Sequence, residues 1–146
     1  ASDVYKRQIL TVLLLIIPKT RKTGVIMMAA LLVDVLLCNV LIKNLVARTR
    51  PFDVNTAVQL LIEKPQDYSF PSGHTAASFA SVTALYLAGE KKMWKAALVL
   101  AVLIALSRLY LYVHYPTDII GGVIFGSLSG YLGYKIVEWI QKKKIK

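Results

Sequence analysis

The sequence predicts an all-α protein, a polytopic transmembrane helical bundle with about four to five spanning segments. Hydrophobic residues make up 56% of the 146 residues, and the mean hydropathy is +0.56. The apolar runs are longer than those of a soluble core, and they suit helices of the length that crosses a bilayer. Lipid is therefore the expected main solvent of this chain.

The chain begins with a polar stretch, "ASDVYKRQ", which leads into an apolar stretch at residues 9–17. That apolar stretch has about half the length that a spanning helix needs. We interpret it as the end of a spanning segment whose beginning lies upstream. Residues 1–8 are expected to be a non-native or disordered leader, and residues 9–146 to form a single membrane-embedded domain.

Four later segments have the length and composition of spanning or near-spanning helices. They lie at residues 24–42, 75–89, 93–113 and 119–140. In the last segment Gly122, Gly126 and Gly130 recur at four-residue spacing, and alanines crowd the segment that begins at residue 75. Small residues at such spacing let helices approach closely in lipid, so these two helices are expected at the centre of the bundle.

Basic residues give the chain a net charge of +10. Many fall in three clusters between or after the apolar runs, at residues 19–22, 91–95 and 142–146. This distribution is typical of a membrane protein with charged loops and argues against nucleic-acid binding. If the clusters share one side, the positive-inside rule places that side in the cytoplasm. Both histidines, His74 and His114, then face the extracytoplasmic side.

A short amphipathic helix is predicted on the outward membrane surface, at residues 55–64 ("NTAVQLLIEK"). Asp53 or Asn55 would cap it. Arg48 fits none of the spacings discussed below, and we interpret it as a contact to lipid headgroups.

Three outward stretches hold residues that suit an anion. They are "KNLVARTRP" with Lys43 and Arg50, "PSGH" at residues 71–74, and "SRLYLYVHYPTD" with Arg108, His114 and Asp118. Guanidinium groups engage phosphate oxygens in a bidentate fork, and lysine adds a mobile point charge. Ser72 and the backbone amides around Gly73, at the start of a helix, would add neutral donors. The combination predicts a phosphate or diphosphate site.

Taken singly, each of these residues has a simpler explanation. Lys43 and Arg50 alone would fit cations that snorkel to the membrane interface. Ser72 could serve only as a helix N-cap, and His74 could be an ordinary surface histidine. Asp118 could simply favour the first turn of the last helix.

Jointly, the three stretches resemble the signature of the type-2 phosphatidic acid phosphatase superfamily. That signature is lysine, six residues and arginine-proline, then proline-serine-glycine-histidine, then serine-arginine, five residues, histidine, three residues and aspartate. Every position is matched here with its internal intervals intact, over residues 43–118. The architecture that the resemblance implies is a six-helix core.

The resemblance implies a metal-independent phosphatase without a cofactor. It assigns His114 as the nucleophile that forms a phosphohistidine, with Asp118 orienting its ring. It assigns His74 the protonation of the leaving lipid oxygen and then the activation of water. The residues that would bind the phosphate are Lys43, Arg50, Ser72, Gly73 and Arg108. No carboxylate cluster suited to magnesium accompanies these residues, so no metal site is predicted.

The implied partner is a lipid phosphate whose tails stay in the bilayer, and the implied location is a bacterial plasma membrane with the site outside. Undecaprenyl diphosphate is the first candidate, because that carrier must be dephosphorylated after it delivers its glycan outside. Phosphatidylglycerophosphate and phosphatidic acid are alternatives. A lipid phosphotransferase and a non-catalytic lipid-phosphate binding protein stay open as rival functions. The vanadium-dependent haloperoxidases share the site pattern, but they are soluble and much larger.

Overall fold

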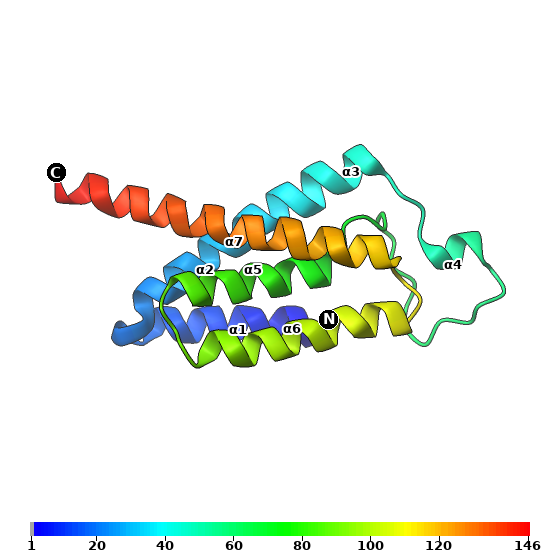
Figure 1. Ribbon diagram of the computed structural model, residues 1–146, viewed down its shortest axis with the longest axis horizontal. Helices are drawn as coiled ribbons and strands as arrows, with labels where there is room; N and C mark the ends of the chain where they lie inside the picture. The colour runs from blue at the N-terminus through cyan, green and yellow to red at the C-terminus, as the bar shows by residue number, and fades with distance from the viewer. Residues whose placement is uncertain (1) are drawn as a thin grey trace.

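The computed structural model describes residues 2–146, with side chains from Tyr5 onward, and its regular structure is helical (Figure 1). The elements in chain order are α1 (Ser2–Ile16), the 3₁₀ turn η1 (Pro18–Thr20), α2 (Arg21–Asp34), the π-helix η2 (Val35–Ile42), α3 (Lys43–Val46), α4 (Pro51–Val54), α5 (Gly73–Leu87), α6 (Met93–Tyr110) and α7 (Pro116–Ile145). Residues 2–146 contain no strand, so the all-α prediction is confirmed.

The chain is a membrane protein with helical spans. Three segments of the described chain are long and apolar enough to cross a membrane, namely Pro18–Val54, Met93–Tyr110 and Pro116–Ile145. The remaining long helices, α1 and α5, have 15 residues each. A helix of that length falls short of the hydrocarbon thickness, which explains why fewer full spans are found than the four to five expected.

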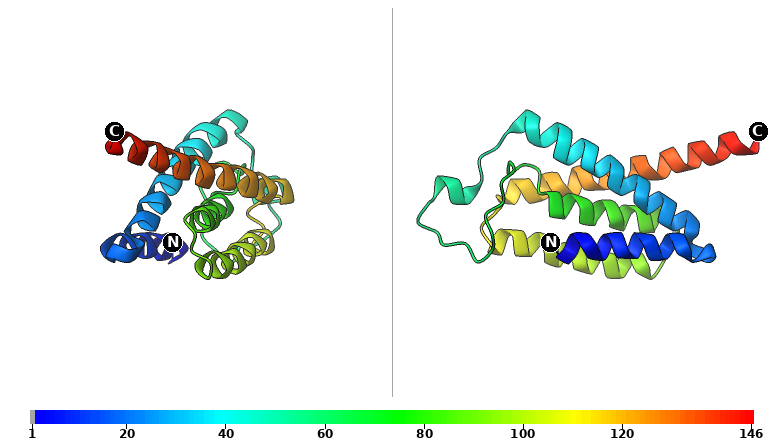
Figure 2. Two further views of the ribbon diagram at one scale, coloured as in Figure 1. Left: turned by 60° about the vertical axis from the view of Figure 1, so that its left-hand side comes forward. Right: turned by 180° about the vertical axis from the view of Figure 1, so that it is seen from behind.

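The two ends of the bundle carry different parts of the sequence (Figures 1 and 2). The α1–α2 and α5–α6 connections lie at the end where the chain terminates, on the left of Figure 1. Contacts tie this end together, since Lys22 pairs with Glu138 at 2.8 Å and the Thr23 hydroxyl donates to Glu90 at 2.8 Å. The three basic clusters therefore share one end, as predicted. The chain between α3 and α5 and the α6–α7 turn lie at the other end.

α5 and α7 pack directly against each other through small residues. A Cβ atom at Gly126 would lie 2.1 Å from the carbonyl oxygen of Ala76, and one at Gly130 would lie 2.7 Å from that of Ala80. Real Cβ atoms do not approach a backbone oxygen so closely, so this contact requires glycine on α7. The predicted central position of these two helices is confirmed.

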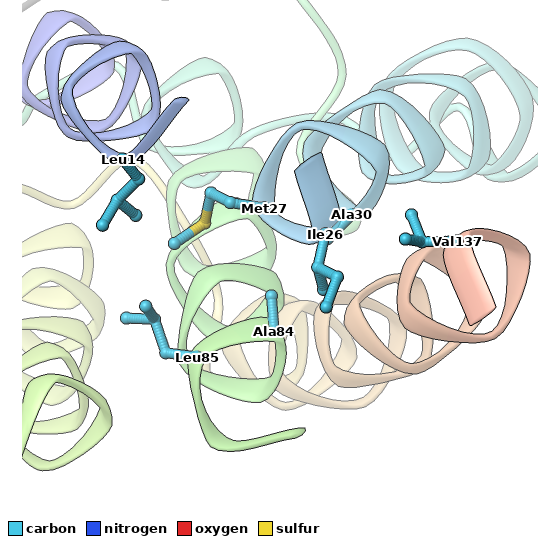
Figure 3. Close-up of a cluster of buried hydrophobic side chains, with 7 residues drawn as sticks. All are labelled: Leu14, Ile26, Met27, Ala30, Ala84, Leu85 and Val137. Atoms are coloured by element: carbon cyan, nitrogen blue, oxygen red, sulfur yellow. The ribbon is translucent and has the colours of Figure 1, made fainter. Parts of the chain in front are cut away.

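Buried apolar side chains join four helices at the basic end of the bundle (Figure 3). α1, α2, α5 and α7 supply them, and they are Leu14, Ile26, Met27, Ala30, Ala84, Leu85 and Val137. Their burial fixes the helices relative to one another at one end. The opposite ends of these helices are left to hold polar groups.

Several helix boundaries differ from the expected ones for local reasons. α5 begins at Gly73, two residues early, because Ser72 caps it with its hydroxyl accepting from the Thr75 N–H at 3.4 Å. α6 ends at Tyr110 because Tyr112 has a φ of 59°, which a right-handed helix cannot accommodate. α3 ends at Val46, because the next residue, Ala47, has a φ of 48°.

The surface helix predicted at residues 55–64 does not form, and that prediction was wrong. These residues make turns and irregular chain, and the nearby helical structure is the single turn of α4, with Pro51 in its first position. A helix as short as the one predicted at residues 55–64 is unstable without tertiary packing. Pro65, directly after it, also disfavours helical backbone at residue 64.

The boundary expected after residue 8 does not appear as a break in the structure. α1 runs from Ser2 to Ile16 without interruption at residue 8.

Candidate active site

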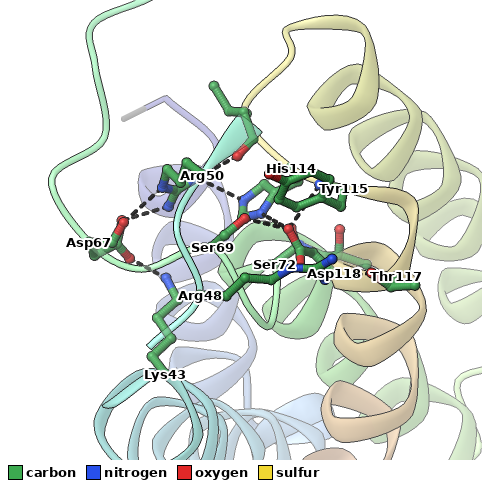
Figure 4. Close-up of polar contacts among 12 residues, drawn as sticks. Lys43, Arg48, Arg50, Asp67, Ser69, Ser72, His114, Tyr115, Thr117 and Asp118 are labelled. Atoms are coloured by element: carbon green, nitrogen blue, oxygen red, sulfur yellow. Dashed lines mark hydrogen bonds and ion pairs between the residues drawn. The ribbon is translucent and has the colours of Figure 1, made fainter. Parts of the chain in front are cut away.

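His114 and Asp118 face each other at the start of α7 (Figure 4). Tyr115 is the N-cap of this helix and Pro116 follows, at a position where the missing N–H of proline is not needed. One carboxylate oxygen of Asp118, Oδ2, accepts from the backbone N–H of Tyr115 at 2.8 Å and lies 3.3 Å from Nδ1 of His114. Asp118 therefore caps the helix and orients the histidine at the same time.

The surroundings of His114 favour a neutral ring that carries its proton on Nδ1. Because Nδ1 donates to Asp118, Nε2 keeps its lone pair, and Nη1 of Arg50 lies 3.2 Å from it. Burial lowers the pKa of His114, the hydrogen bond to Asp118 raises it, and the charges of Arg50 and Lys43 lower it again, so the net pKa lies below the usual 6.5. A neutral imidazole with an unprotonated ring nitrogen is a nucleophile.

Asp118 is fully buried and has further partners that the motifs did not indicate. The Ser69 hydroxyl donates to Oδ2. Nη1 of Arg48 lies 2.9 Å from Oδ1 and 2.5 Å from the Thr117 hydroxyl, and the guanidinium stacks 4.2 Å above the Tyr115 ring. The interpretation of Arg48 as a headgroup contact was wrong, because its charge is used to hold Asp118.

Lys43 and Arg50 converge on the same side of the site. Their side chains are only 6% and 4% exposed, which excludes the simple explanation that they snorkel toward water. Arg50 donates from Nη1 to the Val113 carbonyl at 2.8 Å, next to His114. Both cations also contact the carboxylate of Asp67, a residue of the irregular chain between α4 and α5 (Figure 4).

Ser72 and Gly73 bring the start of α5 to these groups. The Ser72 N–H donates to the Asp118 carbonyl at 3.0 Å, which fastens α5 to α7. A Cβ atom at Gly73 would lie 3.6 Å from Nζ of Lys43 and 3.1 Å from Oδ1 of Asn39. The absence of a side chain therefore leaves the helix N-terminus close to the lysine ammonium, where both would attract one anion.

His74 follows on the first turn of α5 and is half-buried. With Gly73, Lys43 and Asp67 it lines a cavity of about 500 Å³. His74 therefore shares open space with the cations of the site. Arg108 is half-buried on the last turn of α6, and its carbonyl accepts from the Val113 N–H at 3.4 Å, which places its backbone near the loop that carries His114.

Sequence reasoning missed three residues of this site. Arg48 carried one usable signal, because it is a cation that lies outside the three basic clusters of the sequence. Ser69 and Asp67 carried no comparable signal, since they lie in chain without regular periodicity and meet the site only through the tertiary fold.

The chain is similar in sequence to known undecaprenyl-diphosphatases. An undecaprenyl-diphosphatase of Sulfolobus acidocaldarius is 38% identical over 135 residues, covering 92% of this chain and 65% of that protein. The undecaprenyl-diphosphatase BcrC of Bacillus subtilis is 30% identical, covering 73% of this chain and 54% of its own length. The chain thus spans between about half and two thirds of these relatives.

The fold also resembles a solved structure, the crystal structure of a transmembrane PAP2-type phosphatidylglycerolphosphate phosphatase from Bacillus subtilis. The TM-score is 0.67 and the identity 30%, with coverage of 96% of this chain and 69% of that one. The family profile described as the PAP2 superfamily matches residues 22–142. By its motifs, its fold and this match, the chain belongs to the PAP2 superfamily.

Proposed function

We propose that this protein is a metal-independent lipid phosphate phosphatase that works through a phosphohistidine on His114. The observation that carries the proposal is the orientation of that histidine, with Nδ1 toward Asp118 (3.3 Å) and Nε2 beside Arg50 (3.2 Å). Such an arrangement prepares Nε2 to attack the phosphorus of a phosphate whose oxygens are bound by Arg50.

In the proposed first step, Lys43, Arg50 and Arg108 hold the nonbridging phosphate oxygens together with the donors at Ser72 and Gly73. Nε2 of His114 forms a bond to phosphorus while the bond from phosphorus to the lipid oxygen breaks. The imidazole becomes a cation, which the nearby Asp118 carboxylate stabilises. The fixed cations balance the charge that the transferring phosphoryl group carries. The reaction therefore depends mainly on positioning and electrostatic stabilisation.

His74 supplies the proton transfers in this scheme. It gives its proton to the departing lipid oxygen, and it then takes a proton from the water that attacks the phosphohistidine. The new bond from water oxygen to phosphorus replaces the nitrogen–phosphorus bond and releases inorganic phosphate. His74 and His114 must begin in opposite protonation states, and the lowered pKa of His114 supports its role as the neutral partner.

The cavity beside His74 supports a lipid as the substrate. Besides the polar groups of the site, apolar side chains line it, including Val12, Leu15, Leu31 and Val35. A lipid tail would suit these residues, while the phosphate reaches the cations. Our first candidate is undecaprenyl diphosphate, which the relatives' names support. Phosphatidylglycerophosphate, supported by the name of the solved relative, and phosphatidic acid are the alternatives.

We further propose that the site faces the extracytoplasmic side of a bacterial plasma membrane. The basic clusters lie at the opposite end of the bundle, which the positive-inside rule assigns to the cytoplasm (Figure 1).

The test is phosphate release in detergent with a chelator present, from undecaprenyl diphosphate, phosphatidylglycerophosphate and phosphatidic acid. Wild-type protein should release phosphate, and His114→Ala should abolish release. A strict metal requirement, or unchanged turnover in His114→Ala, would contradict the proposal. Transfer of the phosphate to an added lipid alcohol instead of water would identify a phosphotransferase. Binding without turnover would identify a lipid-phosphate binding protein.

A further inference from the structure

Asp67 contacts both of the buried cations that the proposed function assigns to phosphate (Figure 4). Its Oδ2 pairs with Nζ of Lys43, and its Oδ1 lies 2.6 Å from Nη2 of Arg50. The backbone carbonyl of Asp67 also accepts from Nε of Arg50 at 2.8 Å. One carboxylate thus bridges the lysine and the arginine, as two oxygens of a phosphate would.

A phosphate that engages Arg50 competes with this carboxylate for the same donors. Nη1 of Arg50 is directed to the Val113 carbonyl at 2.8 Å and to Nε2 of His114 at 3.2 Å. Nε and Nη2 form the other edge of the guanidinium, and Asp67 takes both. A phosphate contact to Nη2 therefore requires the Asp67 carboxylate to move away, whereas Nε is held by the backbone carbonyl of Asp67.

The exposure of the three side chains shows which one can move. The side chains of Lys43 and Arg50 are 6% and 4% exposed, whereas that of Asp67 is 55% exposed. Asp67 belongs to the irregular chain between α4 and α5 and lines the cavity with His74. Arg50 is also held by the buried Val113 carbonyl, and the Asp67 carboxylate meets both cations at the cavity. The side chain of Asp67 itself can turn into water, and a bound phosphate would then replace it as the partner of the two buried cations.

The charge of Asp67 also favours its departure when a phosphate binds. Burial raises its pKa, but hydrogen bonds and charges from Lys43 and Arg50 outweigh this effect and leave the pKa lowered. The group is therefore an anion at neutral pH. A phosphate beside it would be repelled, which adds to the competition for donors.

We propose that Asp67 is an internal competitor of phosphate, which holds Lys43 and Arg50 in place, leaves them when substrate binds, and weakens the binding of the product phosphate. This inference rests on the proposed function of the same site. Asp67 would thereby set the affinity for the phosphate group and favour release of inorganic phosphate after turnover.

The test compares inhibition of lipid hydrolysis by inorganic phosphate in wild-type protein and in Asp67→Asn. Removing the charge should lower the inhibition constant about fivefold, which corresponds to an ion pair of about 1 kcal/mol. Asp67→Glu keeps the charge and should restore weak inhibition. Asp53→Asn is the matched control, because Asp53 is also half-exposed, forms an ion pair with Lys64 at 3.3 Å and lies outside the site. It should leave inhibition unchanged.

If Asp67 only positioned the two cations, Asp67→Asn would bind inorganic phosphate more weakly and lose turnover, which would overturn the inference. An unchanged inhibition constant would overturn it as well. Failure of the proposed function would show differently, as no phosphate release by the wild type from any lipid. Direct calorimetric titration of inorganic phosphate into the detergent-solubilised proteins then still decides, since Asp67→Asn must bind more tightly than wild type.

Discussion

Asp118→Asn removes one charge and one acceptor from the centre of the site. In the native protein Oδ2 receives hydrogen bonds from His114, from the Ser69 hydroxyl and from the Tyr115 N–H at 2.8 Å, while Oδ1 receives one from Arg48 at 2.9 Å. An asparagine has a single acceptor oxygen. If it replaces Oδ2, the amide N–H groups point at the Arg48 guanidinium. If it replaces Oδ1, they point at the Tyr115 N–H and at His114.

Either orientation leaves donors facing donors in a fully buried place, and the charge that stabilises an imidazolium is lost. In a serine protease triad the corresponding change lowers kcat by about 10⁴ because the histidine takes the wrong tautomer. We expect a loss of about 10³-fold or more here, which equals about 4 kcal/mol in activation free energy. The unfolding free energy should fall by about 2 kcal/mol from the unsatisfied buried donors.

The assay is steady-state phosphate release together with thermal unfolding in detergent, with Asp53→Asn as the control for loss of a surface carboxylate. A kcat for Asp118→Asn within tenfold of wild type would refute this account of how His114 is oriented.

Three further predictions concern packing, residue coupling and pH. Gly126→Ala should lower the unfolding temperature in detergent and reduce turnover, because its Cβ would lie 2.1 Å from the Ala76 carbonyl oxygen and force α7 away from α5. Arg48→Met should lower kcat roughly tenfold or more with little change in KM, because Arg48 contacts Asp118 at 2.9 Å and the effect of losing a charged hydrogen bond is of that size. The lowered pKa of His114 keeps the nucleophile neutral at mildly acidic pH, so kcat/KM should fall only as the pH drops below 6.5.

Controls sharpen these predictions. Ile124→Val changes an exposed residue on the other side of α7 and should leave unfolding and turnover unaltered. A wild-type unfolding temperature in Gly126→Ala would contradict the close packing of α5 on α7. A raised KM with unchanged kcat in Arg48→Met would contradict the action of Arg48 through Asp118. An acid limb of kcat/KM at or above pH 6.5 would show that burial does not set the ionisation of His114.

The helical architecture was predictable because lipid permits few alternatives for long apolar runs. The close packing of α7 through its glycines was also predictable. Small residues at four-residue spacing, such as Gly126 and Gly130, commonly let two helices approach closely in a membrane. The helix ends were less predictable. They depend on a hydroxyl cap at Ser72 and on left-handed backbone at Ala47 and Tyr112, which no hydrophobic pattern encodes.

The main groups of the site were predictable because their spacing is fixed within short stretches. Asp118, for example, reaches His114 from one helical turn away. The surrounding charges were not predictable. Arg48 pairs with Asp118, and Asp67 pairs with Lys43, so each has a partner far along the chain. Only the folded loop between α3 and α5 brings these partners together.

The most direct test of the central claim is to trap the phosphoenzyme. Protein mixed with a lipid labelled with ³²P in its terminal phosphate, in the presence of chelator, is quenched rapidly in base and digested for peptide mapping. The account predicts an acid-labile, base-stable label on the peptide that contains His114, absent from His114→Ala. Phosphate release without any label on His114 under these conditions would contradict a covalent mechanism.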